Sequence, residues 1–578
     1  MSGTTSGTPK LKILGIAHDV YICSAAVVVD GEVVSAIPEE RLDRKKQSRV
    51  FPSLAIDRCV REAGLTIHDI DEIAVAWNPA IEIQSTPAGY LDARRWRTEH
   101  LAQVPARLAA ILGTPPNGEM TLTNLAEGAP PVTFVDHYHA HLGNALSVCP
   151  DDPVAFLVMD GRGETLTDQA GIFSGSRVEV TSEVHYPHSL GLFYGMVTQF
   201  LGFKPDSDEW KVMALASYAD PMGDTYDRLS KLITVEEDGT FRLALEYFEH
   251  YNFFDRRLYS DVFVEEFGPP RRAGEVVTDR DEALAAAMQR VFEETVTKIL
   301  AVLHERSGLD SVILSGGSFM NSVFNGKATE LTPFSRCYIS GSPDDSGTSI
   351  GAALFLHNLR TGSRPALSSH NSWGPQYTDD DCLDVARRYK LPGAEVVDDP
   401  SRRAAQELAD GRIVGWFQGR MEFGQRALGN RSILLDPRRS DGRDLLNQAV
   451  KFREAFRPFA PAILAERVSD YFECPEDARV PFMERVYMFR PEKRAEVPSV
   501  VHVDGSGRLQ TVTREDNPRY YELISHFEGL TGVPIVLNTS FNLNGEPIVC
   551  SPEDAIRTFM TCGLDTLYLG NVRIPKQA

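Results

Sequence analysis

The chain of 578 residues is longer than one hydrophobic core usually supports, so we expect at least two domains. Its 42% hydrophobic and 24% charged residues are typical of a globular protein, which excludes the disordered and fibrous classes. The 59 basic and 81 acidic residues give a net charge of −22, which argues against nucleic acids and acidic membranes as partners. A phosphate-bearing substrate would therefore need a local basic pocket.

The N-terminus and the cysteines point to the cytoplasm. The first ten residues, MSGTTSGTPK, lack the apolar core of a secretory signal. No apolar run reaches the roughly 18 to 20 residues that span a bilayer. The eight cysteines lie far apart without CxxC spacing, which favours free thiols in a reducing compartment.

The first elements predict a β-rich start. Two apolar runs from Leu11 onward flank Asp30-Gly31, a turn dipeptide typical of a β-hairpin. We expect a helix over 53–63 and a buried strand over 72–77, followed by a looser, proline-containing insertion. Further strands are predicted over 131–135 and 154–159, and a second hairpin around 171–180.

The later elements predict a second α/β unit. A long helix over 281–307 precedes a strand over 311–314. The segment 358–381 is rich in Gly, Pro, Ser and charge, so we place the domain boundary there. A helix over 401–410 and a strand over 413–416 open the second unit, which runs to the end of the chain. No fixed-period internal repeat is evident.

Two histidines and two aspartates form a candidate metal site. His137 and His141 in HYHAH lie four residues apart, hence on one helical face. Asp160 ends an apolar strand, and Asp345 lies in a glycine-containing turn. A mixed imidazole and carboxylate site suits iron, manganese or zinc. Taken singly, each residue also fits an ordinary core histidine, a turn former or a helix cap.

Two further groups of residues suggest phosphate binding. Gly316 and Gly317 follow a strand and precede a helical segment, where backbone N–H groups can face a phosphate, although such junctions are also common without a ligand. The densest basic cluster lies in the second unit and contains Arg420, Arg426, Arg431, Lys451, Arg453 and Arg457. Arginine forks bind phosphates bidentately, whereas a solvated helix face is the alternative reading. Asn538, Thr539 and Ser540 add polar groups after a strand.

These residues lie in a series of motifs that resembles the family of tobramycin, cephamycin, novobiocin, ansamycin and nodulation-factor O-carbamoyltransferases. The resemblance runs from about Leu11 to the C-terminus. In chain order the motifs are EERLDRKK (39–46), DHYHAH (136–141), MDGRGE (159–164), SLGLFYGMVTQFLGF (189–203), EWKVMALA (209–216), LSGGSFMNSVFNGK (314–327), DDSGTSIGAA (344–353), FGQRALGNRSIL (423–434), KFREAFRPFAP (451–461), GRLQTV (507–512) and LNTSFNLNGEP (537–547).

The resemblance implies an α/β fold with two domains. An N-terminal actin-like ATPase (ASKHA-type) domain, residues 11–357, would carry the metal site, and a C-terminal YrdC-like α/β domain, residues 376–578, would bind ATP and carbamoyl phosphate. The implied metal ligands are His137, His141, Asp160 and Asp345, and ferrous iron is the implied metal. The positions implied to bind ATP, with its Mg²⁺, and carbamoyl phosphate are Arg426, Lys451, Arg453, Arg508, Asn538 and Ser540. From their pattern alone, Gly316 and Gly317 are also predicted to contact a phosphate.

The implied reaction joins ATP and carbamoyl phosphate into a carbamoyl-adenylate and passes the carbamoyl group to an acceptor hydroxyl. Lys46 matches a lysine that the resemblance places near the acceptor. Family members usually carry a histidine where this chain has Tyr21, and His18 lies three residues upstream, on the opposite face if the segment is a strand. The base that takes the acceptor proton therefore stays open. Gln425 also stands where proline is usual.

Other readings remain at this point. A tRNA-modifying threonylcarbamoyl transferase shares both domain types, but the charge of −22 argues against tRNA. A catalytically silent nucleotide- or metal-binding protein is the non-enzymatic alternative. The family suggests a small hydroxylated molecule of secondary metabolism, such as an antibiotic precursor, as acceptor, and amine or N-hydroxyl acceptors also stay open. The oligomeric state is open too, with a homodimer as one option.

Overall fold

The computed structural model describes residues 10–18, 20–79, 81, 120–122, 130–251, 256–451 and 456–576. Most of the insertion predicted after residue 77 therefore lies outside the described residues. Within them, none of the helices combines the length and the apolar character that crossing a membrane requires.

The first sheet has the strand order β3-β2-β1-β4-β6-β5. Strand β1 pairs antiparallel with β2 and parallel with β4, which in turn pairs parallel with β6. The predicted hairpin at Asp30-Gly31 is confirmed, because both residues have positive φ (51° and 79°), as a tight turn between β2 and β3 requires. The strands are β1 (Lys12–Ala17), β2 (Ser24–Val29), β3 (Glu32–Pro38), β4 (Glu72–Val75), β5 (Met120–Leu122) and β6 (Val132–Phe134).

The second sheet repeats this pattern with the order β9-β8-β7-β12-β13. A three-stranded antiparallel meander is again extended by two parallel strands on the side of its first strand. The strands are β7 (Val154–Met159), β8 (Leu166–Ser174), β9 (Arg177–His185), β12 (Ser311–Ser315) and β13 (Arg336–Tyr338). This duplicated topology is that of the actin-like ATPase fold, so the predicted fold class is confirmed. The duplication lies in strand order, which is why no repeat is visible in the sequence.

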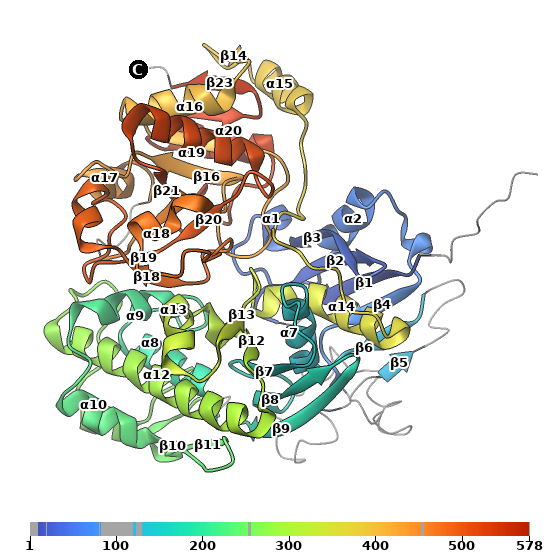
Figure 1. Cartoon of the computed structure of the whole chain (residues 1–578), viewed down its shortest axis with the longest axis vertical. Helices are drawn as coiled ribbons and strands as arrows, with labels where there is room; N and C mark the ends of the chain where they lie inside the picture. Colours follow the sequence, from blue (N-terminus) through green and yellow to red (C-terminus); the bar gives the residue numbers. More distant parts are fainter. Residues whose placement is uncertain are drawn as a thin grey trace, which may run out of the picture.

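Two helices lie between these sheets, α7 (His137–Leu146) and α14 (Thr348–Thr361) (Figure 1). They pack so closely that a methyl group on Gly351 would lie 1.7 Å from the carbonyl oxygen of Ala140. Helix α14 follows the second sheet in the chain but packs on strands β1, β2 and β4 of the first. The other helices of this part include α1 (Glu40–Asp43), α2 (Ser53–Glu62), α8 (Leu190–Phe200), α9 (Glu209–Leu215), α10 (Asp224–Leu229), α11 (Asp261–Phe267), α12 (Asp279–Ser307) and α13 (Ser322–Leu331).

The C-terminal part forms an eight-stranded mixed sheet with the order β14-β23-β22-β15-β16-β21-β17-β20. The buried residues of its apolar core lie between Cys382 and Ile574, and the partly buried Tyr377 packs against them. The strands are β14 (Glu395–Val396), β15 (Val414–Phe417), β16 (Arg431–Leu435), β17 (Ala460–Leu464), β20 (Gln510–Val512), β21 (Ile535–Ser540), β22 (Thr566–Leu569) and β23 (Val572–Pro575). The accompanying helices include α15 (Asp379–Arg388), α16 (Pro400–Ala409), α17 (Gly442–Leu446), α18 (Val468–Tyr471), α19 (Pro518–Thr531) and α20 (Pro552–Thr561). A two-stranded sheet of β18 (Val486–Met488) and β19 (Ser506–Arg508) lies where this part meets the N-terminal one (Figure 1).

The EERLDRKK segment joins the two parts of the molecule. The buried Arg41 guanidinium donates to the carbonyl oxygen of Gly424 at 2.6 Å. Arg44 donates to the carbonyl oxygens of Pro547 (2.9 Å) and Ile548 (2.6 Å). Gly424 and Pro547 belong to the FGQRALG and LNTSFNLNGEP motifs and Ile548 directly follows the second, so motifs far apart in the sequence meet at one interface.

We expect Gly351→Ala to lower the free energy of unfolding by about 1 to 3 kcal/mol, because the added methyl group would overlap the Ala140 carbonyl. Gly529→Ala is the matched control: it also lies in a helix, α19, but no atom lies within 4 Å of its added methyl group. It should instead stabilise by about 0.5 to 1 kcal/mol. Chemical denaturation of both variants measures the difference, and equal effects would contradict the close helix contact.

Candidate metal centre

Helix α7 places two imidazoles at one point. The Asp136 side chain caps the helix by accepting from the backbone N–H groups of Tyr138 (2.8 Å) and His139 (3.3 Å). The helix that begins here brings His137 and His141 to one face, and both are fully buried. His139 differs, since its ring stacks on Phe355 with centroids 4.8 Å apart. The spacing of HYHAH thus predicted this local geometry correctly.

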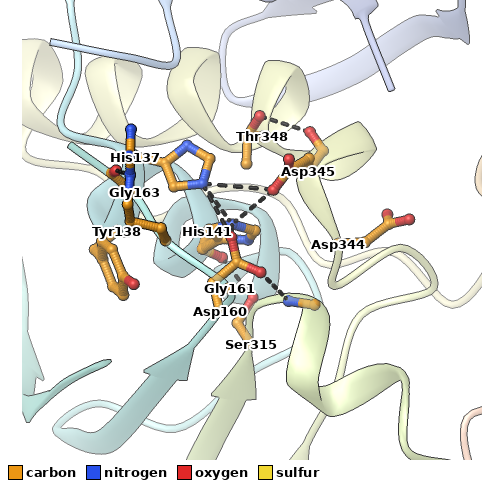
Figure 2. Close-up of polar contacts among 12 residues, drawn as sticks. His137, Tyr138, His141, Asp160, Gly161, Gly163, Ser315, Asp344, Asp345 and Thr348 are labelled. Atoms are coloured by element: carbon orange, nitrogen blue, oxygen red, sulfur yellow. Dashed lines mark hydrogen bonds and ion pairs between the residues drawn. The ribbon is translucent and has the colours of Figure 1, made fainter. Parts of the chain in front are cut away.

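Asp160 and Asp345 complete a cluster of four donor groups (Figure 2). The Nε2 atoms of His137 and His141 are 3.1 Å apart. The Asp160 Oδ2 atom lies 3.4 and 3.7 Å from these two nitrogens, and the Asp345 Oδ1 atom lies 3.5 and 3.6 Å from them. One donor atom from each residue lies within 4.8 Å of all the others.

This arrangement fits a metal ion. Metal–ligand bonds of about 2.0 to 2.2 Å set tetrahedral ligands roughly 3.3 to 3.6 Å apart, close to the separations found here. The Nδ1 atom of His137 lies 3.2 Å from the carbonyl oxygen of Ala76. An N–H donated there leaves the Nε2 lone pair pointing into the cluster, as a ligand needs. The four side chains can therefore hold a metal, while the geometry alone does not select iron, manganese or zinc.

Backbone N–H groups orient the two carboxylates. Gly317 donates to Asp160 Oδ1 at 3.0 Å, and Tyr21 donates to Asp345 Oδ2 at 3.0 Å. Gly316 has φ of 96°, and a methyl group there would lie 2.2 Å from the Met159 carbonyl oxygen. Glycine is required at this position, because the loop approaches the end of β7 closely. The phosphate-binding role predicted for the two glycines stays a prediction.

The cluster also shifts the proton affinities of its members. Burial alone would lower the pKa of His137, but hydrogen bonds and charges from Asp160 and Asp345 outweigh it and raise that pKa. Burial raises the pKa of Asp345, yet its contacts with the two histidines bring the pKa well below the usual value. Without a metal, the pocket thus favours an imidazolium paired with carboxylates. A metal must displace that proton to bind.

Glu164 contacts the backbone of the cluster residue His137. Its carboxylate accepts from the backbone N–H groups of Asn78 (2.7 Å) and His137 (3.1 Å). Burial, with the charge of Asp136, raises the pKa of Glu164 to about 8. The MDGRGE motif contains this residue, but the sequence alone does not assign it a role.

The three residues predicted near the acceptor lie in different surroundings. Tyr21 contacts Asp345 through its amide, as described above. His18 packs its ring edge-on against Phe51 with centroids 5.4 Å apart. Both lie in the loop between β1 and β2, because β1 ends at Ala17, so the strand on which the opposite-face expectation depended is not present there. Lys46 follows α1 and is exposed as a whole residue, but burial of its ammonium lowers its pKa, against the charge of Glu40.

In the C-terminal part, the buried Lys451 lies beside Ser540. Its ammonium donates to the Ser540 carbonyl oxygen (2.5 Å), to the Asn542 carbonyl oxygen (3.0 Å) and to Asn542 Oδ1 (2.9 Å). Asn538, two residues earlier on β21, donates to the Ala427 carbonyl oxygen at 3.1 Å and to Gln510 Oε1 at 3.0 Å. Two of the predicted ligand-binding motifs therefore meet at one end of β21.

The remaining basic residues lie nearby or outside the described residues. Arg426 precedes Ala427 and lines a small cavity shared with Phe319 and Pro343 of the N-terminal part. Burial lowers the pKa of Arg426 to about 10, against the opposing charge of Asp344. Arg508 ends β19, two residues before Gln510. Arg453 lies outside the described residues.

One contact that the sequence did not predict links the metal cluster to the C-terminal part. The Gln425 amide donates to the Asp344 carboxylate, which is next to the cluster residue Asp345. Asp344 points away from the four donors in Figure 2. The glutamine at position 425, where proline is usual, could have indicated this contact from the sequence, because glutamine has a side-chain donor and proline has none.

The structure thus joins a duplicated actin-like fold, which carries a histidine and aspartate cluster, to a second α/β part. The family model of the carbamoyltransferase N-terminus matches residues 12–354, and that of the carbamoyltransferase C-terminus matches residues 405–576. The chain belongs to the carbamoyltransferase family.

Named relatives agree with this assignment. The nodulation protein NolNO of Sinorhizobium fredii is 35% identical over 96% of this chain and 79% of its own length. A 3'-hydroxymethylcephem-O-carbamoyltransferase of Streptomyces clavuligerus is 36% identical over 48% of this chain and 50% of its own. An uncharacterized protein of Synechocystis sp. is 37% identical over 98% of this chain and 97% of its own. Full-length HypF covers 62% of this chain and 56% of its own at 14% identity with a TM-score of 0.31, so the fold assignment rests on strand order instead.

We expect His137→Ala to abolish stoichiometric binding of Fe²⁺, Mn²⁺ or Zn²⁺, because it removes a donor from the centre of the cluster. His139→Gln, two residues along the same helix, should keep the metal, since its ring faces Phe355. Elemental analysis after dialysis measures the bound metal. In the wild type, the apparent affinity should rise with pH because binding displaces a proton; equal metal content in both variants would exclude this site.

Proposed function

We propose that the protein is an ATP- and metal-dependent O-carbamoyltransferase. ATP and carbamoyl phosphate would react in the C-terminal domain, residues 376–578, to give a carbamoyl-adenylate and pyrophosphate. The N-terminal domain, residues 11–357, would then transfer the carbamoyl group to a hydroxyl of a small molecule. The observation that carries this proposal is the buried four-donor cluster in a chain of the carbamoyltransferase family.

The C-terminal chemistry requires positive charge in a protein of net charge −22. Lys451 and Arg426 are cations with little exposed surface, so they interact strongly with phosphate oxygens. Ser540 and Asn538 add polar groups along β21. We assign these four residues, with Arg453 and Arg508, to the binding of ATP, its Mg²⁺ and carbamoyl phosphate. Gly316 and Gly317 would approach the intermediate from the N-terminal side.

The N-terminal chemistry requires an electrophilic carbonyl and a bound acceptor. His137, His141, Asp160 and Asp345 would hold the metal, for which we favour ferrous iron, and a metal here supplies a Lewis acid that polarises a carbonyl. Lys46, exposed beside Glu40, would contact the acceptor. The surrounding apolar core excludes water from the back of the cluster.

The acceptor is a small hydroxylated molecule in this proposal. The Streptomyces relative is named for a hydroxymethylcephem, and the other named relative for nodulation. These names support a product of secondary metabolism, with sugar, macrolide and β-lactam hydroxyls as candidates. The ATP requirement and eight free cysteines favour a cytoplasmic setting.

Measuring the two partial reactions, pyrophosphate release and carbamoyl transfer, tests the two domains separately. We expect Lys451→Ala to lower pyrophosphate release from ATP and carbamoyl phosphate by at least about 10²-fold, because a desolvated cation is lost from the reacting phosphates. His137→Ala should release pyrophosphate at a near wild-type rate and fail to carbamoylate an acceptor. Lys493→Ala, which removes a half-exposed lysine of the same domain, is the control for the first variant. Equal loss of both partial reactions in both variants would contradict the division of labour.

A panel of hydroxylated natural products tests the overall reaction. After incubation with ATP, carbamoyl phosphate and Fe²⁺, mass spectrometry should find one added carbamoyl group on at least one compound. No pyrophosphate release at all would favour a silent binding protein instead. Tight tRNA binding at physiological salt would favour a tRNA-modifying transferase, against the charge of −22.

A further inference from the structure

Tyr21 connects the metal cluster to a second carboxylate. Its backbone N–H donates to Asp345, and its phenol O–H donates to Asp206 at 2.5 Å. Arg49 lies over the same ring at 4.1 Å from its centroid. Tyr21 therefore links Asp206 to the cluster residue Asp345 through one residue. Among the described residues, Asp206 is hydrogen-bonded to Tyr21, Gln47 and Glu209 and to none of the four cluster residues.

Asp206 is held in a backbone conformation that aspartate adopts at a cost. Its φ is 59°, in the left-handed region that residues other than glycine rarely occupy. Two contacts hold it there: its N–H donates to Glu209 Oε1 (2.6 Å), and its carbonyl oxygen accepts from Gln47 Nε2 (2.9 Å). Gln47 is itself at φ of 57°. Backbone strain of this kind is concentrated at functional sites.

The carboxylate of Asp206 has the properties of a general base. Asp206 is exposed as a whole, but local desolvation of its carboxylate raises its pKa. The Tyr21 hydrogen bond and the charge of Arg49 lower that pKa, and the charges of Asp345 and Asp160 raise it. A carboxylate with a raised pKa accepts a proton more readily near neutral pH. Tyr21 bonds only one carboxylate oxygen, and no donor among the described residues reaches the other, Oδ1.

The catalytic residues predicted from the sequence, His18, Tyr21 and Lys46, are less suited to act as the general base. His18 is turned edge-on against Phe51. Burial raises the pKa of the Tyr21 phenol far above neutrality, and its proton already bonds Asp206. Lys46 has no hydrogen bond to Tyr21 or to the four cluster residues, although burial lowers the pKa of its ammonium.

We propose that Asp206 removes the proton from the acceptor hydroxyl, and that Tyr21 is the positioning residue that aims it. This rests on the function proposed above. The acceptor O–H bond breaks as its oxygen bonds the carbamoyl carbon, and the proton passes to Asp206 Oδ1. The bond from that carbon to the phosphate oxygen breaks, and AMP leaves with the electron pair. Asp206 then loses the proton to solvent. The pair takes the place of the histidine that related enzymes carry at position 21.

Single turnovers with water and with hydroxylamine as probes test this assignment. Water needs a base to attack the carbamoyl-adenylate, whereas hydroxylamine is nucleophilic without one and yields hydroxyurea. We expect Asp206→Asn to slow hydrolysis of the intermediate by about 10²-fold or more. Hydroxyurea formation and pyrophosphate release should stay within about two-fold of wild type. Asp206→Glu should recover part of the hydrolysis, which a purely structural loss would not allow.

The pH profile gives an independent readout. Wild-type hydrolysis should fall at low pH as the base becomes protonated, and Asp206→Asn should lose this acid limb. Tyr21→Phe keeps the amide bonded to Asp345 but removes the phenol O–H. Hydrolysis by this variant should therefore be slower than in the wild type and still show the acid limb. Hydrolysis by Asp206→Asn within three-fold of wild type, or an unchanged acid limb, overturns the assignment. Absence of pyrophosphate in the wild type would instead sink the proposed function itself.

Discussion

The structure depends on the burial of two carboxylates and two imidazoles within contact of one another. Asp160 and Asp345 would repel each other in an apolar interior unless positive charge lay between them. Either a protonated histidine or a metal ion supplies that charge. Much of the local design follows from this requirement: the Asp136 cap starts the helix, Gly317 donates to one carboxylate, and Tyr21 donates to the other.

The same loop that carries Asp345 also contacts the C-terminal part. Gln425 bonds Asp344, and Arg426 lines a cavity with residues from both parts. The buried Arg41 adds another contact between the two parts, because it donates to the Gly424 carbonyl oxygen. In the proposed reaction, Arg426 binds the activated intermediate and Asp345 binds the metal. Their neighbours in the chain, Gln425 and Asp344, are hydrogen-bonded to each other, so the two sites are linked.

The sequence predicted what depends on local spacing or on a complete motif. The His137 and His141 pair follows from helical period, and the hairpin from Asp30-Gly31, because both are local effects. Three kinds of feature were not predictable. The duplication lies in strand order, and the Gln425 contact joins residues 81 positions apart in the chain. Asp206 is singled out by a backbone angle and by neighbours from a distant loop, which no residue pattern encodes.

The close contact between α7 and α14 restricts how this enzyme can move. Each helix approaches the other through small residues, and α14 rests on the sheet of the opposite half. Rotating the two halves against each other would separate Asp345 from the imidazoles and break tightly fitted backbone contacts. The N-terminal part should therefore behave as a rigid block. In the proposed reaction, entry of ATP and release of the product would then require movement at the boundary between the two parts, which Arg41, Arg44 and Gln425 cross.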